Sequence, residues 1–213
     1  KAIRAALNMD DIMYSATGND SFYDLDPDQL WFRSQALWSD TGKEVYNQHN
    51  IELAKKLAKE AGYNNEPIRF LASATQFHHR RPAIMITEQL REAGFNIFLD
   101  LRDWPTLVQQ RQDYSTWDIT YTREVLHVPT DVEAITTLGF NSPETQKLID
   151  TISTETDMAK LRAAFELFKK EVMVEQLPWV AMGDMFALRG EREWLKGLQP
   201  IYLHPLWNVW LEK

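Results

Sequence analysis

Five histidines and a scattering of carboxylates are the side chains of this chain that could do chemistry. His78 and His79 are adjacent, and neighbouring residues of a helix point in different directions, so one helix face cannot offer both to a metal ion. We interpret the pair as part of a solvated polar loop before a helix. A role in binding a metal or a metal chelate is the alternative.

The carboxylates give no convincing catalytic pair. Asp100 and Asp103 flank Arg102 at the end of a predicted strand, and a helix cap with a surface ion pair explains them better than a glycosidase site does. The chain has no cysteine, no glycine-rich nucleotide loop, no nucleophile elbow and no zinc-protease or calcium-loop motif. We therefore expect no catalytic residue, no metal and no cofactor.

Composition indicates a folded protein that does not bind nucleic acid. Of the 213 residues, 44% are hydrophobic and 25% are charged, and the net charge is -8, so the basic patch that nucleic acid requires is missing. No apolar run approaches the roughly twenty residues of a membrane span. The chain begins abruptly inside an amphipathic pattern, which we interpret as a cut, so the missing signal peptide carries little weight.

Two copies of one pattern dominate the first half of the chain. In each copy a polar-faced helix ends at an Ala-Gly-aromatic sequence, at Gly62 and at Gly94, and an alternating apolar run follows. Asn50 is a good cap for the first helix, and Pro82 is a good first residue for the second. Glycine adopts the left-handed conformation that stops a helix, and the aromatic residue after it begins a strand.

The predicted elements alternate between helix and strand along most of the chain. We expect helices over 1–14, 50–62, 82–93, from 103–105 onward, over 142–152 and from 157 to 177, and strands over 68–72, 95–101 and 117–121. The turn-rich stretch 15–46 carries several aromatic residues. Such an order predicts an α/β fold with helices packed on a mixed sheet.

A series of sequence blocks resembles one known family. KAIRAALNMDDIM, YNQHNIELAKKLAKEAGYNNEPIRFLAS, ITEQLREAGFNIFLDLRDW, WDITYTRE, FNSPETQKLID, VEQLPWVAM and LHPLWNVWLEK follow one another in the order of similar blocks in the bacterial extracellular solute-binding proteins of family 5. These are the peptide- and nickel-type receptors of ABC importers. Each block alone is weak, but the ordered set spans almost the whole chain and is fairly specific.

The resemblance implies one lobe of a periplasmic-binding-protein-like fold of class II, cluster C. Residues 1–177 would form the ligand-binding lobe, and residues 178–213, which hold four tryptophans, would return toward the other lobe. The N-terminal lobe would be absent from this chain. The partners would be a peptide-like or other polar solute and an ABC permease. The location would be periplasmic or extracellular, with a lipid anchor in a Gram-positive source.

In this family the connections at one edge of the sheet face the cleft, as the general rule for open α/β sheets also expects. Two loops then become candidates, 73–80 and 122–129. In peptide-binding members an Asp in the second loop pairs with the amino terminus of the peptide. Alignment on Pro129 places Val125 there, and Arg123 instead indicates a carboxylate or phosphate on the ligand. The site residues that we predict are Thr75, Gln76, Phe77, His78, Tyr121, Arg123, Glu124 and His127, with Trp38 as an aromatic wall.

The sequence therefore predicts a receptor that captures its solute by closure of two lobes around a hinge, and not an enzyme. Two other classes stay open. A hydrolytic domain that acts on glycosides would need two carboxylates facing each other across one pocket. A sensory ligand-binding domain would be fused to a signalling module. Peptides, opines, oligosaccharides and metal chelates are all possible ligands.

Overall fold

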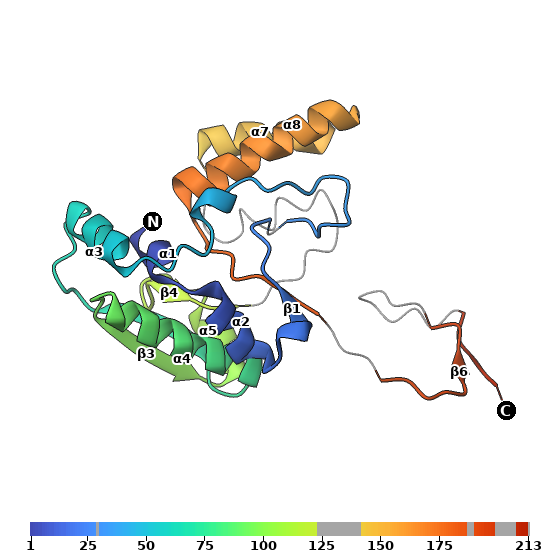
Figure 1. Ribbon diagram of the computed structural model, residues 1–213, viewed down its shortest axis with the longest axis horizontal. Coiled ribbons are helices and arrows are strands. Elements are labelled where there is room, and N and C mark those ends of the chain that lie inside the picture. The colour runs from blue at the N-terminus through green and yellow to red at the C-terminus, as the bar shows by residue number, and fades with distance from the viewer. Residues whose placement is uncertain (29, 123–141, 187–189, 199–207, 213) are drawn as a thin grey trace.

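The structure of the chain is a computed structural model, which describes residues 1–28, 30–122, 142–186, 190–198 and 208–212 (Figure 1). Its centre is a sheet of three strands in the order β3-β2-β4. These strands are Ile68–Ser73 (β2), Ile97–Arg102 (β3) and Ile119–Thr120 (β4). All three strands lie where the sequence predicted them, and the α/β class is confirmed.

The central sheet is parallel. β2 pairs with β3 from Ile68 opposite Ile97 to Ser73 opposite Arg102, and it pairs with β4 on its other side. Antiparallel pairing joins only short strands outside this sheet: Tyr23–Asp24 (β1) with Asp184–Met185 (β5), and Leu195–Lys196 (β6) with Trp210–Leu211 (β7). In the described residues the central sheet is therefore not the mixed sheet that we expected.

The two glycines end their helices as predicted. α3 (Ile51–Glu60) is capped by the side chain of Asn50, which accepts a hydrogen bond from the N–H of Leu53 at 2.9 Å. Gly62 follows this helix with a φ of 80°, and Gly94 follows α4 (Phe77–Glu92) with a φ of 88°. Both values lie in the left-handed region, where glycine has no steric cost.

The start predicted for α4 at Pro82 is wrong. The helix begins at Phe77, and Pro82 lies inside it. The N–H of Arg80 already donates to the carbonyl of Gln76 at 2.8 Å. Proline is a good first helical residue, but a helix can also carry it further in when tertiary packing offsets the single hydrogen bond that its missing N–H costs. Pro82 is buried here.

The helix predicted over 1–14 is two helices, α1 (Ala2–Ala6) and α2 (Met9–Thr17). Leu7 between them has an extended backbone, and the side chain of Asn8 caps α2. Gln89 of α4 holds this break: its Oε1 accepts from the N–H of Asn8 at 2.9 Å, and its Nε2 donates to the carbonyl of Asn8 at 3.4 Å. Gln89 is buried, so a contact distant in sequence sets the bend.

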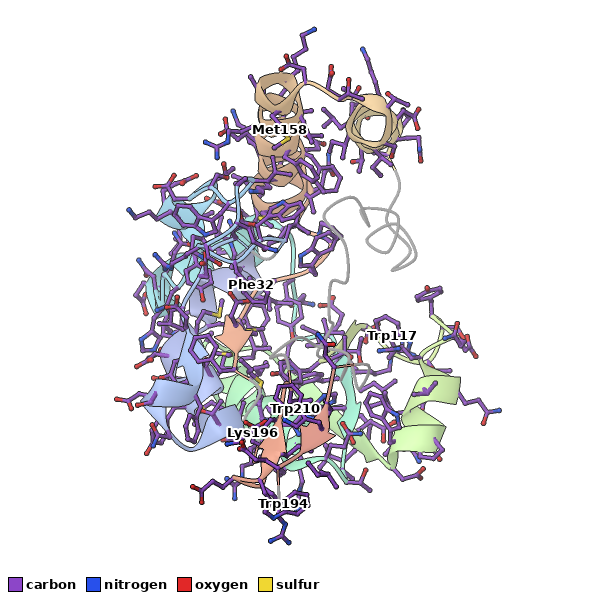
Figure 2. All side chains as sticks on the ribbon, turned by 90° about the vertical axis from the view of Figure 1, so that its right-hand side faces the viewer. Phe32, Trp117, Met158, Trp194, Lys196 and Trp210 are labelled. Atoms are coloured by element: carbon purple, nitrogen blue, oxygen red, sulfur yellow. The ribbon has the colours of Figure 1, made fainter. Side chains whose placement is uncertain are left out.

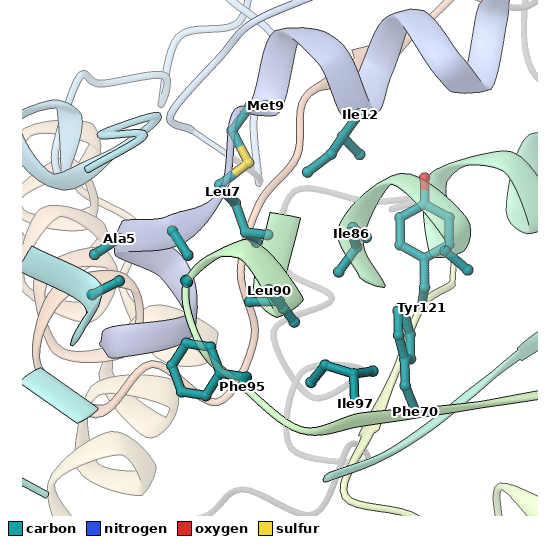
Figure 3. Close-up of a cluster of buried hydrophobic side chains, with 14 of the residues drawn as sticks. Ala5, Leu7, Met9, Ile12, Phe70, Ile86, Leu90, Phe95, Ile97 and Tyr121 are labelled. Atoms are coloured by element: carbon teal, nitrogen blue, oxygen red, sulfur yellow. The ribbon is translucent and has the colours of Figure 1, made fainter. Parts of the chain in front are cut away.

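One buried cluster holds the sheet and the first helices together. α4 packs on β2 and β3, α2 packs on α4, and α1 packs on α3. Figure 3 shows Leu7 and Ile12 above Ile86 and Leu90, with Phe70 and Ile97 of the sheet beneath them. Removing these side chains from water supplies the main stabilisation of this part of the chain.

A second buried cluster lies under the last long helices. α7 (Pro143–Thr154) and α8 (Met158–Lys169) pack on each other and on the loop that carries Trp31 and Leu37. These helices begin where predicted, and the side chains of Ser142 and Asp157 cap them by accepting from the N–H groups of Thr145 and Ala159, respectively. α8 continues as a π-helix over Lys170–Gln176 (η3). The remaining short elements are 3₁₀ turns at Asp20–Phe22 (η1) and Lys43–Val45 (η2), and a helix at Trp104–Gln110 (α5).

The described part of the C-terminal segment forms short strands and no helix. η3 stops at Leu177, whose φ of 55° is left-handed, and Pro178 follows. After β5 the chain reaches the β6–β7 pair, which stands apart from the body of the molecule in Figure 1. Among the described residues no helix combines the length and the apolar character needed to cross a bilayer.

Candidate functional site

The three parallel strands end at one edge of the sheet, which we call the carboxyl edge: residues 73–81, 102–104 and 120–122. Ser73 at the end of β2 is opposite Arg102 at the end of β3, and the N–H of Ala74 donates to the carbonyl of Arg102 at 2.6 Å. β2 passes directly into α4, and β3 into α5. Side chains distant in sequence are therefore brought together where an open α/β sheet ordinarily binds its ligand.

The predicted loop 73–80 is shorter than we expected. Only 74–76 lie between β2 and α4, because Phe77 already begins the helix. Thr75 is exposed, and Gln76 is half-buried at the N-cap, where its side chain makes no capping hydrogen bond. His78 is half-buried in the first turn. The four predicted residues of this segment thus lie together, but at a helix start and not along a flexible loop.

Aromatic rings form most of the carboxyl edge. Phe77 is 61% exposed, and its ring lies edge-on to that of His78 with centroids 5.2 Å apart. The ring of His78 is 4.7 Å from that of His79. His79 in turn lies 5.2 Å from Trp104 and 5.8 Å from Tyr121, also edge to face. The favourable geometry of such pairs fixes the rings, so a rigid platform leads from the core to the solvent.

The interpretation of His79 as part of a solvated loop is wrong. It is only 2% exposed, because Trp104 from the start of α5 and Tyr121 after β4 cover it. Tyr121 is itself a core residue, 8% exposed, so it supports the platform more than it offers a surface. Its position at the carboxyl edge agrees with the prediction that the third strand ends here.

Three residues of the carboxyl edge were missed by the sequence reasoning. Trp104 and His79 belong to the platform, and the guanidinium of Arg81 lies over the ring of Phe77 at 6.0 Å from its centroid. Trp104 could have been found, since it directly follows a predicted strand and the carboxyl ends of parallel strands share one edge. Arg81 could not, because its position depends on a helix that starts five residues before Pro82.

The carboxyl edge also carries the polar groups of Arg102, Asp103 and Thr122. Arg102 forms an ion pair with Asp100, with 2.7 Å between Nε and Oδ1, and the side chain of Gln110 reaches the same carboxylate at 3.4 Å. Arg111 donates to the hydroxyl of Thr122 at 3.2 Å. The side chain of Asp103 caps α5, as the sequence predicted, and its hydrogen bonds from Thr106 lower the pKa of the Asp103 carboxyl. This edge can therefore stack on a planar or apolar group and hydrogen-bond a polar one.

Trp38 lies elsewhere in the fold. It packs on the second buried cluster, its indole N–H donates to the carboxylate of Asp26 at 3.0 Å, and Arg33 lies 5.5 Å from its ring centroid. The structure therefore does not bring Trp38 together with the platform. Arg123, Glu124 and His127 lie outside the described residues, as does the rest of the predicted loop after Thr122.

No metal centre was found in the described part of the chain, where no three side chains of His, Cys, Asp or Glu come together in a way that could hold an ion. The two neighbouring histidines are used differently, because His78 reaches the surface while His79 is packed among rings. The side chains at the carboxyl edge can offer stacking, cation–π contact and hydrogen bonding.

Comparison with known proteins places this geometry in context. The model of the bacterial extracellular solute-binding proteins, family 5 (middle region) matches residues 1–146, which is more than half of the chain. The fold is also similar to that of solved solute-binding proteins at low sequence identity, which bears on the fold alone.

Three of these structures illustrate the similarity. The oligopeptide-binding protein AppA of Bacillus subtilis, in complex with a nonapeptide, has a TM-score of 0.77 at 17% identity, with 100% of this chain and 47% of that chain covered. AgaA of A. tumefaciens R10, in complex with agropinic acid, has a TM-score of 0.71 at 21% identity, with 87% and 39% covered. The dipeptide-binding protein of Pseudoalteromonas sp. SM9913, in complex with Met-Leu, has a TM-score of 0.70 at 17% identity, with 99% and 44% covered. The chain thus spans less than half the length of each of these proteins.

Proposed function

The chain belongs to the bacterial extracellular solute-binding proteins of family 5, and we propose that it forms one lobe of a receptor that captures a peptide or a similar small polar solute for an ABC importer. The family consists of binding proteins and not of enzymes. The observation that carries the finer proposal is the outer end of the platform, where the rings of Phe77 and His78 reach the surface and Arg81 lies over Phe77.

The chemistry of this platform suits a peptide-like solute. An apolar side chain or a planar amide can lie on the exposed ring of Phe77, and Arg81 next to it offers a charge for a carboxylate. Thr75 and Gln76 supply a hydroxyl and an amide close by. Similar proteins were solved with a nonapeptide, with Met-Leu and with agropinic acid, so peptides and opine-type acids are the first classes to test.

Capture by hinge closure requires a second lobe. The chain spans less than half the length of the similar solved proteins, and its described residues after 177 form the short strands β5, β6 and β7 and no helix. The β6–β7 pair exposes Trp194 and Trp210, labelled in Figure 2, and the neighbouring Leu211 is 57% exposed. Apolar side chains of this size favour contact with another protein surface. We propose that residues 1–177 bind solute and that 178–213 pack on the other lobe. Closure would then bring both lobes onto the solute and prepare the receptor for its permease.

The first experiment tests binding by the intact two-lobed receptor. Native mass spectrometry of the receptor with a mixture of free dipeptides, longer peptides and opine-type acids should identify a retained species, which is then titrated calorimetrically. Phe77→Ala should weaken its binding about tenfold, the loss expected for one exposed ring at a binding surface. Arg81→Gln should weaken acidic species more than neutral ones.

Phe98→Ala is the matched control for this experiment. Phe98 is 60% exposed, as Phe77 is 61% exposed, but it lies near the opposite end of β3. The Phe98 variant should bind normally. Equal affinities of the wild type and the Phe77 and Arg81 variants would refute the assignment of the carboxyl edge. Turnover of a bound glycoside would support the hydrolytic alternative instead.

A further inference from the structure

The antiparallel contact between β1 and β5 sets two aspartates directly against each other. We call Tyr23–Asp24 with Gly183–Met185 the β1–β5 joint, in which Asp24 is opposite Asp184 and Tyr23 is opposite Met185. Like charges directly opposite on neighbouring strands destabilise the pairing. The joint is nevertheless tight, because a Cβ atom on Gly183 would stand 2.7 Å from the carbonyl oxygen of Asp24. Only glycine fits at position 183 without moving one of the two strands.

The charges around the joint are unequal in number. Arg33 serves two carboxylates, that of Asp24 at 3.0 Å and that of Asp26 at 3.2 Å. Lys169 of α8 is engaged with Asp28, and both side chains are fully buried. Four carboxylates (Asp24, Asp26, Asp28 and Asp184) thus share two cations, and within the described residues Asp184 forms no ion pair.

Among the described residues, the other groups near the joint bring no positive charge to Asp184. Asp26 is almost fully buried and accepts the indole N–H of Trp38 at 3.0 Å. The hydroxyl of Tyr46 is neutral and donates to the carbonyl of Met182 at 2.7 Å, just before the joint. On the side of α2, Tyr23 donates to Asp10 at 2.5 Å, which leaves that carboxylate engaged with its own partner.

The environment of Asp184 favours its neutral form. Partial burial is the largest cause, and the nearby charges of Asp26, Asp24 and Asp28 add to it, so that the pKa of Asp184 rises to about 7. Arg33 opposes this rise but is shared between two other acids. An aspartic acid whose folded pKa exceeds its unfolded value stabilises the protein less as the pH rises between the two values.

We propose that the β1–β5 joint is a proton-sensitive latch, which is closed when Asp184 carries its proton and loosens when Asp184 is ionised. Protonation of Asp184 removes the negative charge opposite Asp24. The positive charge of Arg33 then serves only Asp24 and Asp26. β5 is the point at which the chain departs toward residues 190–212. The consequence for a receptor rests on the proposed function: above the pH at which Asp184 ionises, the segment that connects the two lobes would be more mobile.

Hydrogen–deuterium exchange of the intact receptor without any solute tests the latch. Peptides that cover residues 20–28 and 180–186 are followed from pH 5 to 8.5, with the exchange rates corrected for the intrinsic effect of pH. Protection at the joint should fall at least about tenfold between pH 5 and 7 and level off above pH 8. One fully linked proton would give about tenfold per pH unit, and the smaller value allows for partial exposure of the joint. Peptides from α4 should show no such step.

Variants make the assignment specific. Asp184→Asn should keep the joint protected at every pH, and Asp24→Asn should move the step to lower pH, because it removes the opposing charge. Glu92→Gln, an exposed change on α4, should retain the wild-type step. A pH-independent joint in the wild type, or an unchanged step in the Asp184 and Asp24 variants, would overturn the proposal. This experiment uses no solute, so its result does not depend on whether the receptor binds peptides.

Discussion

The buried ion pair between Lys169 and Asp28 gives the sharpest test of how the second cluster is held. The Nζ of Lys169 donates to the carboxylate of Asp28, to the carbonyl of Leu37 at 2.8 Å and to the hydroxyl of Ser39 at 3.1 Å. Burial lowers the pKa of Lys169 and raises that of Asp28, and their mutual hydrogen bond opposes both shifts. One side chain on α8 therefore secures three points of the loop over 28–39.

Lys169→Met should cost about 3–5 kcal/mol of unfolding free energy, the range for breaking a buried pair by removing one partner. The remaining carboxylate of Asp28 would keep its backbone donors, at 2.9 Å from Ser39 and 3.0 Å from Leu30, but would lose its counter-charge. For a chain of this length the loss corresponds to a fall in Tm of roughly 6–20 °C. The fall should be smaller at low pH, because protonation of the stranded Asp28 removes part of the penalty.

Urea unfolding followed by circular dichroism, with a check that the m-value is unchanged, measures this loss. Lys170→Met is the matched control, since Lys170 is the exposed neighbour and makes no ion pair in the described part of the chain. It should change the free energy of unfolding by less than about 0.5 kcal/mol. The double variant Asp28→Asn with Lys169→Met should recover part of the loss. A loss below about 1 kcal/mol in the single Lys169 variant would refute the reasoning.

Three further predictions concern single contacts. Phe165→Ala should destabilise the chain by about 3–5 kcal/mol in a urea titration, because this ring is 1% exposed in the second cluster, whereas Phe165→Leu should cost markedly less. Gly183→Ala should lower Tm by a few degrees and loosen the β1–β5 joint in hydrogen exchange, because its φ of 148° and the carbonyl of Asp24 leave no room for Cβ; an unchanged Tm would contradict this. The pKa of Tyr23 is raised to about 12, and its hydrogen bond to Asp10 is the largest cause. The free energy of unfolding should therefore fall as the pH rises from about 10 through 12. Ultraviolet titration of the wild type, compared with Tyr23→Phe, should show one phenol group that ionises at this high pH.

Local signals predicted most of the elements, because the physics of a helix end is local. Gly62 and Gly94 stop their helices, and Asn50, Ser142 and Asp157 begin theirs, through contacts within a few residues. Alternating apolar residues likewise indicated β2 and β3. In all these cases the residue and its structural partner are near each other in the sequence.

The errors arose where a distant contact decides the structure. His79 looked like a loop residue until Trp104 and Tyr121, from two other strand ends, covered it. Pro82 looked like a helix start because its cost inside a helix is visible in the sequence, while the packing that offsets this cost is not. The sequence therefore predicted where the carboxyl edge lies and three of its rings, those of Phe77, His78 and Tyr121. It did not predict that His79 and Trp104 join them.

The contact between Gln89 and Asn8 limits how this region can diverge. The amide of Gln89 accepts from the N–H of Asn8 and donates to the carbonyl of Asn8, much as a neighbouring β-strand would. A glutamate there would offer only acceptors, so the carbonyl of Asn8 would lose its donor. A leucine would leave both the N–H and the carbonyl of this half-buried residue without this partner. Descendants of this chain that keep two short helices at its start should therefore retain an amide at this position.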